Sequence, residues 1–255
     1  MPPEVRRAPI ELIAPAHERD ELRPVCVMLG ATSEEGFAAR RRTAAGLARR
    51  GLGSVLLENA FYGARRPPGQ QGPHLRTVEH QFAMNLATVD EARALLRWLR
   101  GAGHALVGVT GFSQGGAMAA FAAALSPFVV AAAPRGTGDA VAPIFTTAAL
   151  SRRIAWSRLA AELGSLAAAR DYLGRCLEPV RLSRFAPPRA PQAAILVHAR
   201  GDGFVPPEEA VALHRHWSGS QLRWLTGGHV TTSLLFASRQ RQAVLDAFAV
   251  ARRLV

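Results

Sequence analysis

The sequence contains no lysine, so all 31 of its basic residues are arginines. With 19 acidic residues, the formal net charge is +12 at pH 7. The arginines are dispersed along the expected helices instead of being gathered in one arm, and Ala, Gly and Pro are abundant. This pattern is as typical of GC-rich coding as of a selected basic surface. We therefore expect no nucleic-acid partner, although a basic surface favours anionic substrates or a transient contact with a membrane surface.

Cysteines and long apolar runs are also scarce. Cys26 falls in an expected core strand and Cys176 in a helical region far along the chain, so no disulfide framework is indicated and both thiols are expected to be free. No segment reaches the length of a membrane span, and the first residues lack the apolar stretch of a signal peptide. We expect a cytoplasmic protein.

Patterns for cofactors and metals are missing too. The sequence has no phosphate loop, dinucleotide fingerprint or zinc-ligand spacing. His214 and His216 lie two residues apart on an expected helix and therefore face different sides of it. We expect no cofactor and no metal.

What the chain does have is a regular alternation of strand-like and helix-like segments. The expected strands cover 25–29, 54–58, 105–110, 128–133, 194–199 and 221–225, and the expected helices cover 36–50, 78–100, 115–125, 207–217 and 231–252. This alternation predicts an α/β fold, a mainly parallel sheet with helices on both faces, whose sites lie at the carboxyl ends of the strands. With 49% hydrophobic residues in 255, we expect a single domain over 1–255.

The most informative motif joins the expected strand at 105–110 to the helix that follows it. The residues Gly-Phe-Ser-Gln-Gly-Gly at 111–116 form a strand, a sharp turn and a helix start, with Ser113 at the apex. Glycines on both sides are needed because the turn strains the serine backbone and packs the strand against the helix. The motif is weak by itself, but it predicts that an acid and then a histidine follow in later loops.

Both partners are found in that order. Asp202 lies just past the expected strand 194–199, and His229 follows two glycines and opens the last expected helix. Alone, such residues are usually a turn aspartate and a helix cap. Together with Ser113 they predict a catalytic triad, in which His229 takes the serine proton and returns it to the leaving group, while Asp202 orients the imidazole.

A triad of this kind also needs two N–H donors for the tetrahedral oxyanion. The first is expected from the backbone of Gln114, directly after the nucleophile. The second is expected after the strand 25–29, from Ala31 or Thr32.

The segment 135–191 interrupts the alternation. It is helical in pattern and ends in a proline-rich passage at 187–191. In a serine hydrolase an insertion at this place is commonly a cap over the active site, so we expect a helical cap that selects the substrate, with Trp156 and Leu159 lining an acyl pocket. The alternative is that these helices simply pack on the sheet.

Several segments resemble one family. The stretch Leu-Leu-Glu-Asn-Ala-Phe-Tyr-Gly-Ala-Arg-Arg-Pro at 56–67, the basic helix with Arg40, and Pro-Ile-Phe-Thr at 143–146 resemble the alpha/beta-hydrolase domain-containing protein 18 family, whose members carry a similar Leu-Leu-Glu-Asn-x-x-Tyr-Gly-x-Arg stretch. The resemblance spans roughly residues 24 to 250 and implies the alpha/beta-hydrolase fold.

The sequence departs from the resemblance in two places. The family elbow usually has Met after the serine, where this chain has Gln114. Residues 28–30 read Met-Leu-Gly, without the His-Gly pair that precedes many oxyanion loops. Only the backbone N–H of Gln114 is needed for catalysis, whereas the second departure bears on the geometry of the second donor.

Glu58, Asn59 and Tyr62 follow the second core strand and are expected at the rim of the substrate pocket. They could orient the oxyanion loop or the acyl group. Alternatively, Glu58 pairs with an arginine such as Arg40 or Arg65 and holds the loop closed. The second role is favoured because buried carboxylates usually need a partner.

These residues predict a cofactor-independent serine hydrolase that cleaves a small-molecule or lipid-like ester or thioester through an acyl-enzyme. An acyltransferase would use the same triad with an acceptor other than water, and the sequence does not separate the two. A third alternative is a binding protein that keeps the fold without turnover, against which the intact triad argues. The acyl and alcohol groups and the oligomeric state stay open.

Overall fold

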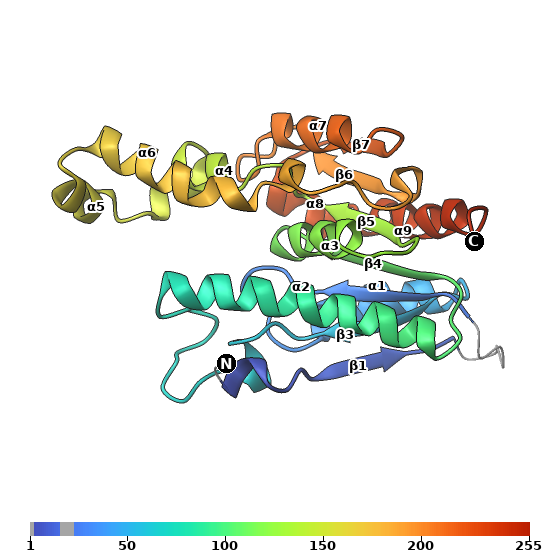
Figure 1. Ribbon diagram of the computed structural model, residues 1–255. Coiled ribbons are helices and arrows are strands. Elements are labelled where there is room, and N and C mark those ends of the chain that lie inside the picture. Colours follow the sequence, from blue (N-terminus) through green and yellow to red (C-terminus); the bar gives the residue numbers. More distant parts are fainter. Residues whose placement is uncertain (1–2, 16–22) are drawn as a thin grey trace.

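The structure, a computed structural model, describes residues 3–15 and 23–255 (Figure 1). Within these residues, seven strands form one sheet: β1 Ile10–Ile13, β2 Val25–Leu29, β3 Gly53–Leu57, β4 Val107–Phe112, β5 Ala131–Arg135, β6 Ile195–Ala199 and β7 Gln221–Leu225. Their order across the sheet is β1-β3-β2-β4-β5-β6-β7. All neighbours pair in parallel except β1 and β3. The mainly parallel sheet expected from the sequence is therefore confirmed.

The helices connect the strands and cover the sheet. They are α1 Ala38–Ala48, α2 Val78–Gly101, α3 Gln114–Ala124, α4 Ala142–Thr146, α5 Trp156–Leu163, α6 Leu166–Leu177, α7 Pro207–His216, α8 His229–Leu235 and α9 Ala237–Ala251. Short 3₁₀ turns lie at Pro3–Val5, Gly63–Arg65, Ala149–Arg153, Glu178–Val180, Leu182–Arg184 and Pro191–Ala193.

Two features differ from the sequence-based expectation. The antiparallel strand β1 was not predicted, because its four residues are too few for a clear period of two. The single helix expected over 231–252 is wrong. The chain instead forms α8 and α9, separated at Phe236, whose backbone leaves the helical region at φ −109° and ψ 30°.

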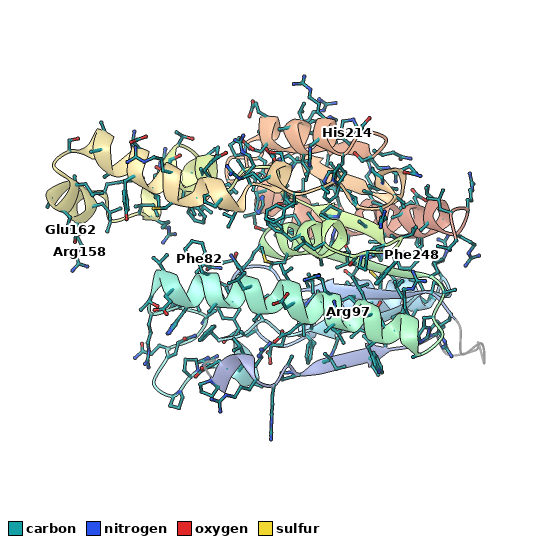
Figure 2. All side chains as sticks on the ribbon, in the orientation of Figure 1. Phe82, Arg97, Arg158, Glu162, His214 and Phe248 are labelled. Atoms are coloured by element: carbon teal, nitrogen blue, oxygen red, sulfur yellow. The ribbon has the colours of Figure 1, made fainter. Side chains whose placement is uncertain are left out.

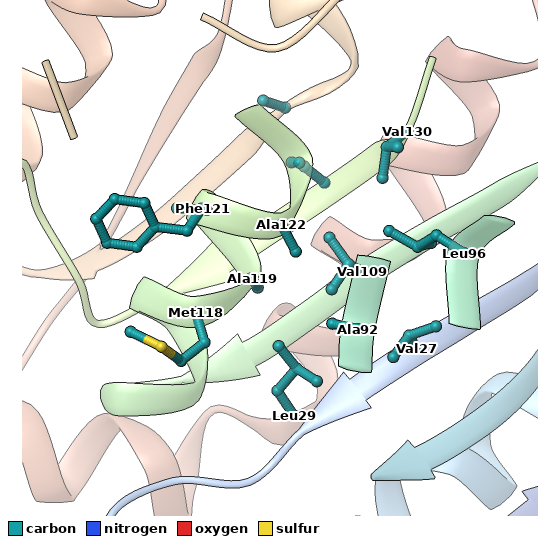
Figure 3. Close-up of a cluster of buried hydrophobic side chains, with 14 of the residues drawn as sticks. Val27, Leu29, Ala92, Leu96, Val109, Met118, Ala119, Phe121, Ala122 and Val130 are labelled. Atoms are coloured by element: carbon teal, nitrogen blue, oxygen red, sulfur yellow. The ribbon is translucent and has the colours of Figure 1, made fainter. Parts of the chain in front are cut away.

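The core consists of two apolar layers, one on each face of the sheet. On one face, α2, α3 and α7 pack against strand residues such as Val27 and Val109, and the close-up in Figure 3 shows Leu96 of α2 and Met118 of α3 meeting them. On the other face, α1 and α9 cover alternate strand residues such as Met28. Because successive side chains of a strand point to opposite faces, fully buried strands supply both layers.

The segment between β5 and β6, residues 136–194, is called the insertion below. Its helices α4, α5 and α6 extend outward from the edge where the parallel strands end (Figure 1). Figure 2 labels Arg158 and Glu162 at its outer end. No residue of α4 or α5 is buried, and α6 buries Ala169 and Leu177. The insertion is thus an outlying helical unit, joined to the body at its base.

Among the helices of the described residues, none combines the length and the apolar composition needed to cross a membrane.

Candidate active site

Ser113 stands in the sharp turn between β4 and α3, with φ 56° and ψ −119°. This backbone conformation is rare for a residue with a side chain. The neighbouring glycines make the turn possible: a Cβ built on Gly111 would lie 2.2 Å from the carbonyl oxygen of Gly115, and one on Gly115 would lie 2.6 Å from that of Leu29. The turn is fixed to β5 by the N–H of Ser113, which donates to the carbonyl of Arg135 at 2.9 Å. The local sequence thus forms a nucleophile elbow.

Asp202 and His229 form a short hydrogen bond at the same edge of the sheet. Asp202 follows β6 and His229 opens α8, and they are 5% and 7% exposed. His229 Nδ1–H donates to Asp202 Oδ2 at 2.6 Å, while Asp202 Oδ1 accepts the N–H groups of Phe204 and Val205, each at 2.9 Å. Burial alone would raise the pKa of Asp202, but these hydrogen bonds outweigh it and lower the pKa. The ionised carboxylate leaves Nε2 as the basic nitrogen of the imidazole.

The imidazole of His229 lies beside the elbow. Its ring centroid is 4.8 Å from that of Phe112, the residue before Ser113, and 5.2 Å from that of Phe204. A Cβ built on Gly136 would lie 3.2 Å from His229 Cε1, so a side chain at that position would crowd the ring. Gly136 directly follows the residue that binds the N–H of Ser113. The structure therefore brings all three predicted triad residues to one place.

A second histidine, His198, lies against the same carboxylate and was not singled out from the sequence. It is 2% exposed, and its Nε2 lies 3.8 Å from Asp202 Oδ2 and 3.1 Å from the carbonyl oxygen of Val205. Burial lowers the pKa of His198, although Asp202 opposes the shift. A neutral His198 that donates to Val205 therefore helps to shape the loop around Asp202. Its position four residues before Asp202 at a strand end was the available signal.

The predicted oxyanion donors meet around the loop after β2. The N–H of Ala31 is already used, because it donates to Glu34 Oε2 at 3.0 Å. For the N–H groups of Thr32 and Gln114, no acceptor is found among the described residues. The Thr32 hydroxyl donates to Gln114 Oε1 at 3.0 Å, and Gln114 Nε2 donates to Asn85 Oδ1 at 2.8 Å. Of the two alternatives for the second donor, this geometry favours Thr32.

The segment 30–66, which contains the loops after β2 and β3 with α1 and β3 between them, is called the oxyanion rim below. The Arg40 guanidinium is buried within it and donates to the carbonyls of Met28 at 2.6 Å, Leu57 at 2.8 Å and Gly36 at 3.1 Å. It also pairs with Glu34 at 2.5 Å, the carboxylate that holds Ala31. One arginine therefore ties the ends of β2 and β3 to the oxyanion loop.

The expected pairing of Glu58 with Arg40 or Arg65 is wrong. The Glu58 carboxylate instead accepts the backbone N–H groups of Gly36 at 2.8 Å and Ala64 at 3.1 Å. Arg40 pairs with Glu34, whereas Arg65 pairs with Glu91 at 2.5 Å and reaches Glu58 only at its backbone carbonyl, at 2.8 Å. Two N–H donors satisfy the buried carboxylate as an arginine would, and they fix both rim loops at once.

Asn59 and Tyr62 are also buried in the rim, at 2% and 1% exposed. Asn59 Nδ2 donates to the carbonyl of Gly30 at 3.2 Å. Burial is the main cause of the raised pKa of Tyr62, and the backbone of Ser33 opposes it. The structure thus places Glu58, Asn59 and Tyr62 behind the oxyanion loop, which they support.

Trp156 and Leu159 are not brought close to these residues. Both lie on α5, half-buried, in the outer part of the insertion (Figures 1 and 2). Trp156 Nε1 donates to the carbonyl of Ser151 at 2.8 Å, and the Arg170 guanidinium lies over its ring at 5.4 Å. Trp156 therefore helps to hold the insertion together.

Exposed apolar side chains beside the elbow come from two other helices, which the sequence did not single out. On α2 they are Val78, Phe82 and Leu86, and on α8 they are Val230, Leu234 and Leu235. The link from Asn85 to Gln114 places this part of α2 next to the elbow, and α8 begins with His229. In Figure 2, Phe82 lies on the side of α2 nearest the insertion. The site therefore has an apolar border.

No group of three or more metal-binding side chains was found in residues 3–15 and 23–255.

Comparisons with known proteins agree with this architecture. The model of a family described as Alpha/beta hydrolase domain containing 18 matches residues 1–173 and 165–250. Among solved structures, Est1E from Butyrivibrio proteoclasticus with bound ferulic acid has a TM-score of 0.62 at 18% identity, covering 95% of this chain and 96% of that one. The butyrate-bound thermophilic esterase Est2 from Thermogutta terrifontis has a TM-score of 0.59 at 17% identity, covering 95% of this chain and 88% of that one. The enol-lactonase from Burkholderia xenovorans LB400 has a TM-score of 0.60 at 16% identity, covering 95% of this chain and 96% of that one. At these identities the likeness establishes the fold, and the alpha/beta-hydrolase fold expected from the sequence is confirmed.

Proposed function

Because this chain belongs to the family described as Alpha/beta hydrolase domain containing 18, we propose that it is a serine hydrolase that cleaves a carboxylic ester or thioester through an acyl-enzyme. Ser113 is the nucleophile, His229 the general base and acid, and Asp202 the residue that orients the imidazole. The observation that carries the proposal is the strained elbow at Ser113 beside a buried His229–Asp202 hydrogen bond of 2.6 Å.

In the first half-reaction, Nε2 of His229 takes the hydroxyl proton of Ser113 as Oγ attacks the acyl carbon. Asp202 stays ionised throughout, since its hydrogen bonds lower its pKa, and stabilises the imidazolium. The N–H groups of Thr32 and Gln114 stabilise the oxyanion. His229 then protonates the leaving alcohol or thiol. In the second half-reaction His229 takes a proton from water as the water attacks the acyl carbon, and returns it to Ser113 Oγ as the bond to the acyl group breaks and the acid leaves.

The border of the site favours an apolar acyl group. Val78 and Leu86 of α2 are 73% and 69% exposed, and Leu234 of α8 is 73% exposed. Apolar side chains gathered beside a nucleophile are suited to an acyl chain that needs shelter from water. Esterases and an enol-lactonase among the structural neighbours are consistent with this substrate class.

An acyltransferase is the second candidate, since the same acyl-enzyme would serve it. The apolar border of the site favours an acyltransferase, because apolar side chains around the acyl-enzyme keep water away from it. A panel of alcohols and thiols added to the hydrolysis assay separates the two: transfer products at the expense of free acid would identify the transferase.

The proposal is tested with a fluorophosphonate probe and an ester and thioester panel of varied chain length. We expect stoichiometric labelling of the wild type, and a loss of turnover on the order of a million-fold with loss of labelling in Ser113→Ala. Ser157→Ala, on the exposed surface of α5, is the matched control and should label as the wild type does. Labelling that survives Ser113→Ala would contradict the assignment of the nucleophile. A wild type that neither labels nor hydrolyses any member of the panel would favour a binding protein.

A further inference from the structure

The polar contacts behind His229 centre on Arg135, at the end of β5. This arginine is 8% exposed, and burial lowers the pKa of its guanidinium to about 10, so it stays charged at neutral pH. Its Nη1–H donates to Gln240 Oε1 at 2.6 Å, while its Nε–H finds no acceptor in the described parts of the chain. A buried cation held by a neutral amide is unfavourable for stability, which points to another role.

Hydrogen bonds link Arg135 to Ser113 directly and to the helix of His229 through Gln240. Its carbonyl accepts the N–H of Ser113 at 2.9 Å. Its side chain reaches α8 through Gln240, whose Nε2–H donates to the carbonyl of Thr232 at 2.5 Å. The Thr232 hydroxyl in turn donates to the carbonyl of His229 at 2.9 Å. A chain of hydrogen bonds therefore runs from the elbow to the helix that carries the imidazole.

Helix α8 has few other contacts to hold it in place. Of its seven residues only His229 and Thr232 are buried. Its apolar residues point away from the core, with Val230, Leu234 and Leu235 at 55%, 73% and 72% exposed. Because helices in proteins are normally placed by the packing of an apolar face, the position of this one depends on its polar anchors.

We infer that Arg135 and Gln240 are positioning residues that set the separation between Ser113 and His229. The inference rests on the proposed hydrolase function, and neither side chain acts on the substrate. Proton transfer between Ser113 and His229 needs hydrogen-bond distance, and a displacement of about 1 Å lowers rates on the order of a hundredfold.

The discriminating variant is Gln240→Glu. Its carboxylate pairs with the Arg135 guanidinium and neutralises the buried charge, but it has no N–H to donate to the carbonyl of Thr232. We expect its melting temperature to equal or exceed that of the wild type, whereas kcat falls about 10- to 100-fold with little change in KM. Gln240→Leu should lose kcat as well, with a lower melting temperature because the guanidinium is left without its acceptor, and Arg135→Met should lose kcat although it removes the buried charge.

The leaving group reports on His229 directly. Because the imidazolium must protonate an alkoxide but not a nitrophenolate, the loss in Gln240→Glu should be larger for an ethyl ester than for the nitrophenyl ester of the same acid. The control is Arg223→Met on the edge strand β7, which removes a bond to Asp246 of α9 and should keep kcat within about twofold.

Wild-type kcat in Gln240→Glu on both esters would overturn the positioning role and leave the proposed function intact. A wild type that reacts with neither ester nor the fluorophosphonate probe would instead overturn the proposed function. The two failures are therefore distinguishable in one set of measurements.

Discussion

The oxyanion rim contains buried arginines, whereas those of the insertion lie on its surface. In the rim, the Arg40 side chain is 7% exposed and bonds the carbonyls of Met28 and Leu57. In the insertion, the Arg175 side chain is 68% exposed and bonds Asp171, one helical turn earlier. A buried guanidinium that joins strand ends fixes the backbone, while an exposed pair within one helix contributes only about 0.3 to 0.5 kcal/mol.

This difference between the rim and the insertion indicates where the molecule tolerates substitutions. In the proposed mechanism the rim holds N–H donors that must lie about 2.7 to 3.1 Å from the oxyanion, and the motif residues Glu58, Asn59 and Tyr62 are buried behind them. In the insertion, helices α4 and α5 bury no residue and α6 buries only two, so substitutions on these outer helices cost little stability. Changes at the rim and the triad should affect all substrates alike, whereas changes in the insertion should depend on the acyl group.

The largest effect is expected at the triad. Asp202→Asn keeps the shape of the residue but leaves the imidazole in the wrong tautomer, and turnover should fall on the order of ten-thousand-fold for short and long acyl chains alike. Steady-state kinetics on acetate and long-chain esters measures this. Turnover close to that of the wild type would mean that another group orients His229.

Arg40→Met should show how firmly the rim is held. Its loss leaves Glu34 and three carbonyls without their donor, which costs about 3 to 5 kcal/mol and lowers the melting temperature by about 10 °C. Arg41→Met is the matched control on the next residue of α1, where the side chain is 57% exposed and pairs with Glu11. It should change stability by less than about 1 kcal/mol. If thermal denaturation gave equal decreases in melting temperature for both variants, the buried arginine would not stabilise the rim more than the exposed one.

The insertion is tested by replacing Trp156 and Leu159 together with serine. If the insertion selects the acyl group, the rate on long-chain esters should fall about tenfold while the rate on acetate esters stays within about twofold. Circular dichroism checks that the fold is intact, since Trp156 also bonds the carbonyl of Ser151. Equal losses across chain lengths would show that the insertion is structural.

The smallest effect is expected for the two cysteines, of which one is buried in the core and the other is exposed on the insertion. Burial raises the pKa of Cys26 in β2 to about 12, whereas Cys176 is exposed on α6 of the insertion. A thiol reagent at neutral pH should modify one cysteine in the native protein and two after denaturation. Cys176→Ser should remove the native reaction. Rapid modification of Cys26 in the folded protein would show that the core opens more readily than the insertion.

The parts of the molecule that local sequence determines were predictable. The elbow at Ser113 needs only a strand, a tight turn and a helix in succession, and the order of Asp202 and His229 follows from it. Contacts between distant segments were not predictable, because spacing carries no information about them. The pairing of Arg40 with Glu34 instead of Glu58 depends on how two loops fold together.

The same limit applies behind the triad. Nothing in the sequence around Arg135 indicates a bond to Gln240, 105 residues later. The break at Phe236 was hidden because no glycine or proline lies between His229 and Ala251 to mark it. Arg135 and Gln240 were missed because each contacts a partner that is remote in the chain.

The backbone of Ser113 also has a consequence for stability. A side chain at φ 56° and ψ −119° costs about 1 to 3 kcal/mol, a conformation that glycine adopts without penalty. Mutation to glycine at this position would therefore make the protein more stable while abolishing its proposed chemistry. Ser113 therefore lowers stability at the same position where it would supply the nucleophile of the proposed reaction.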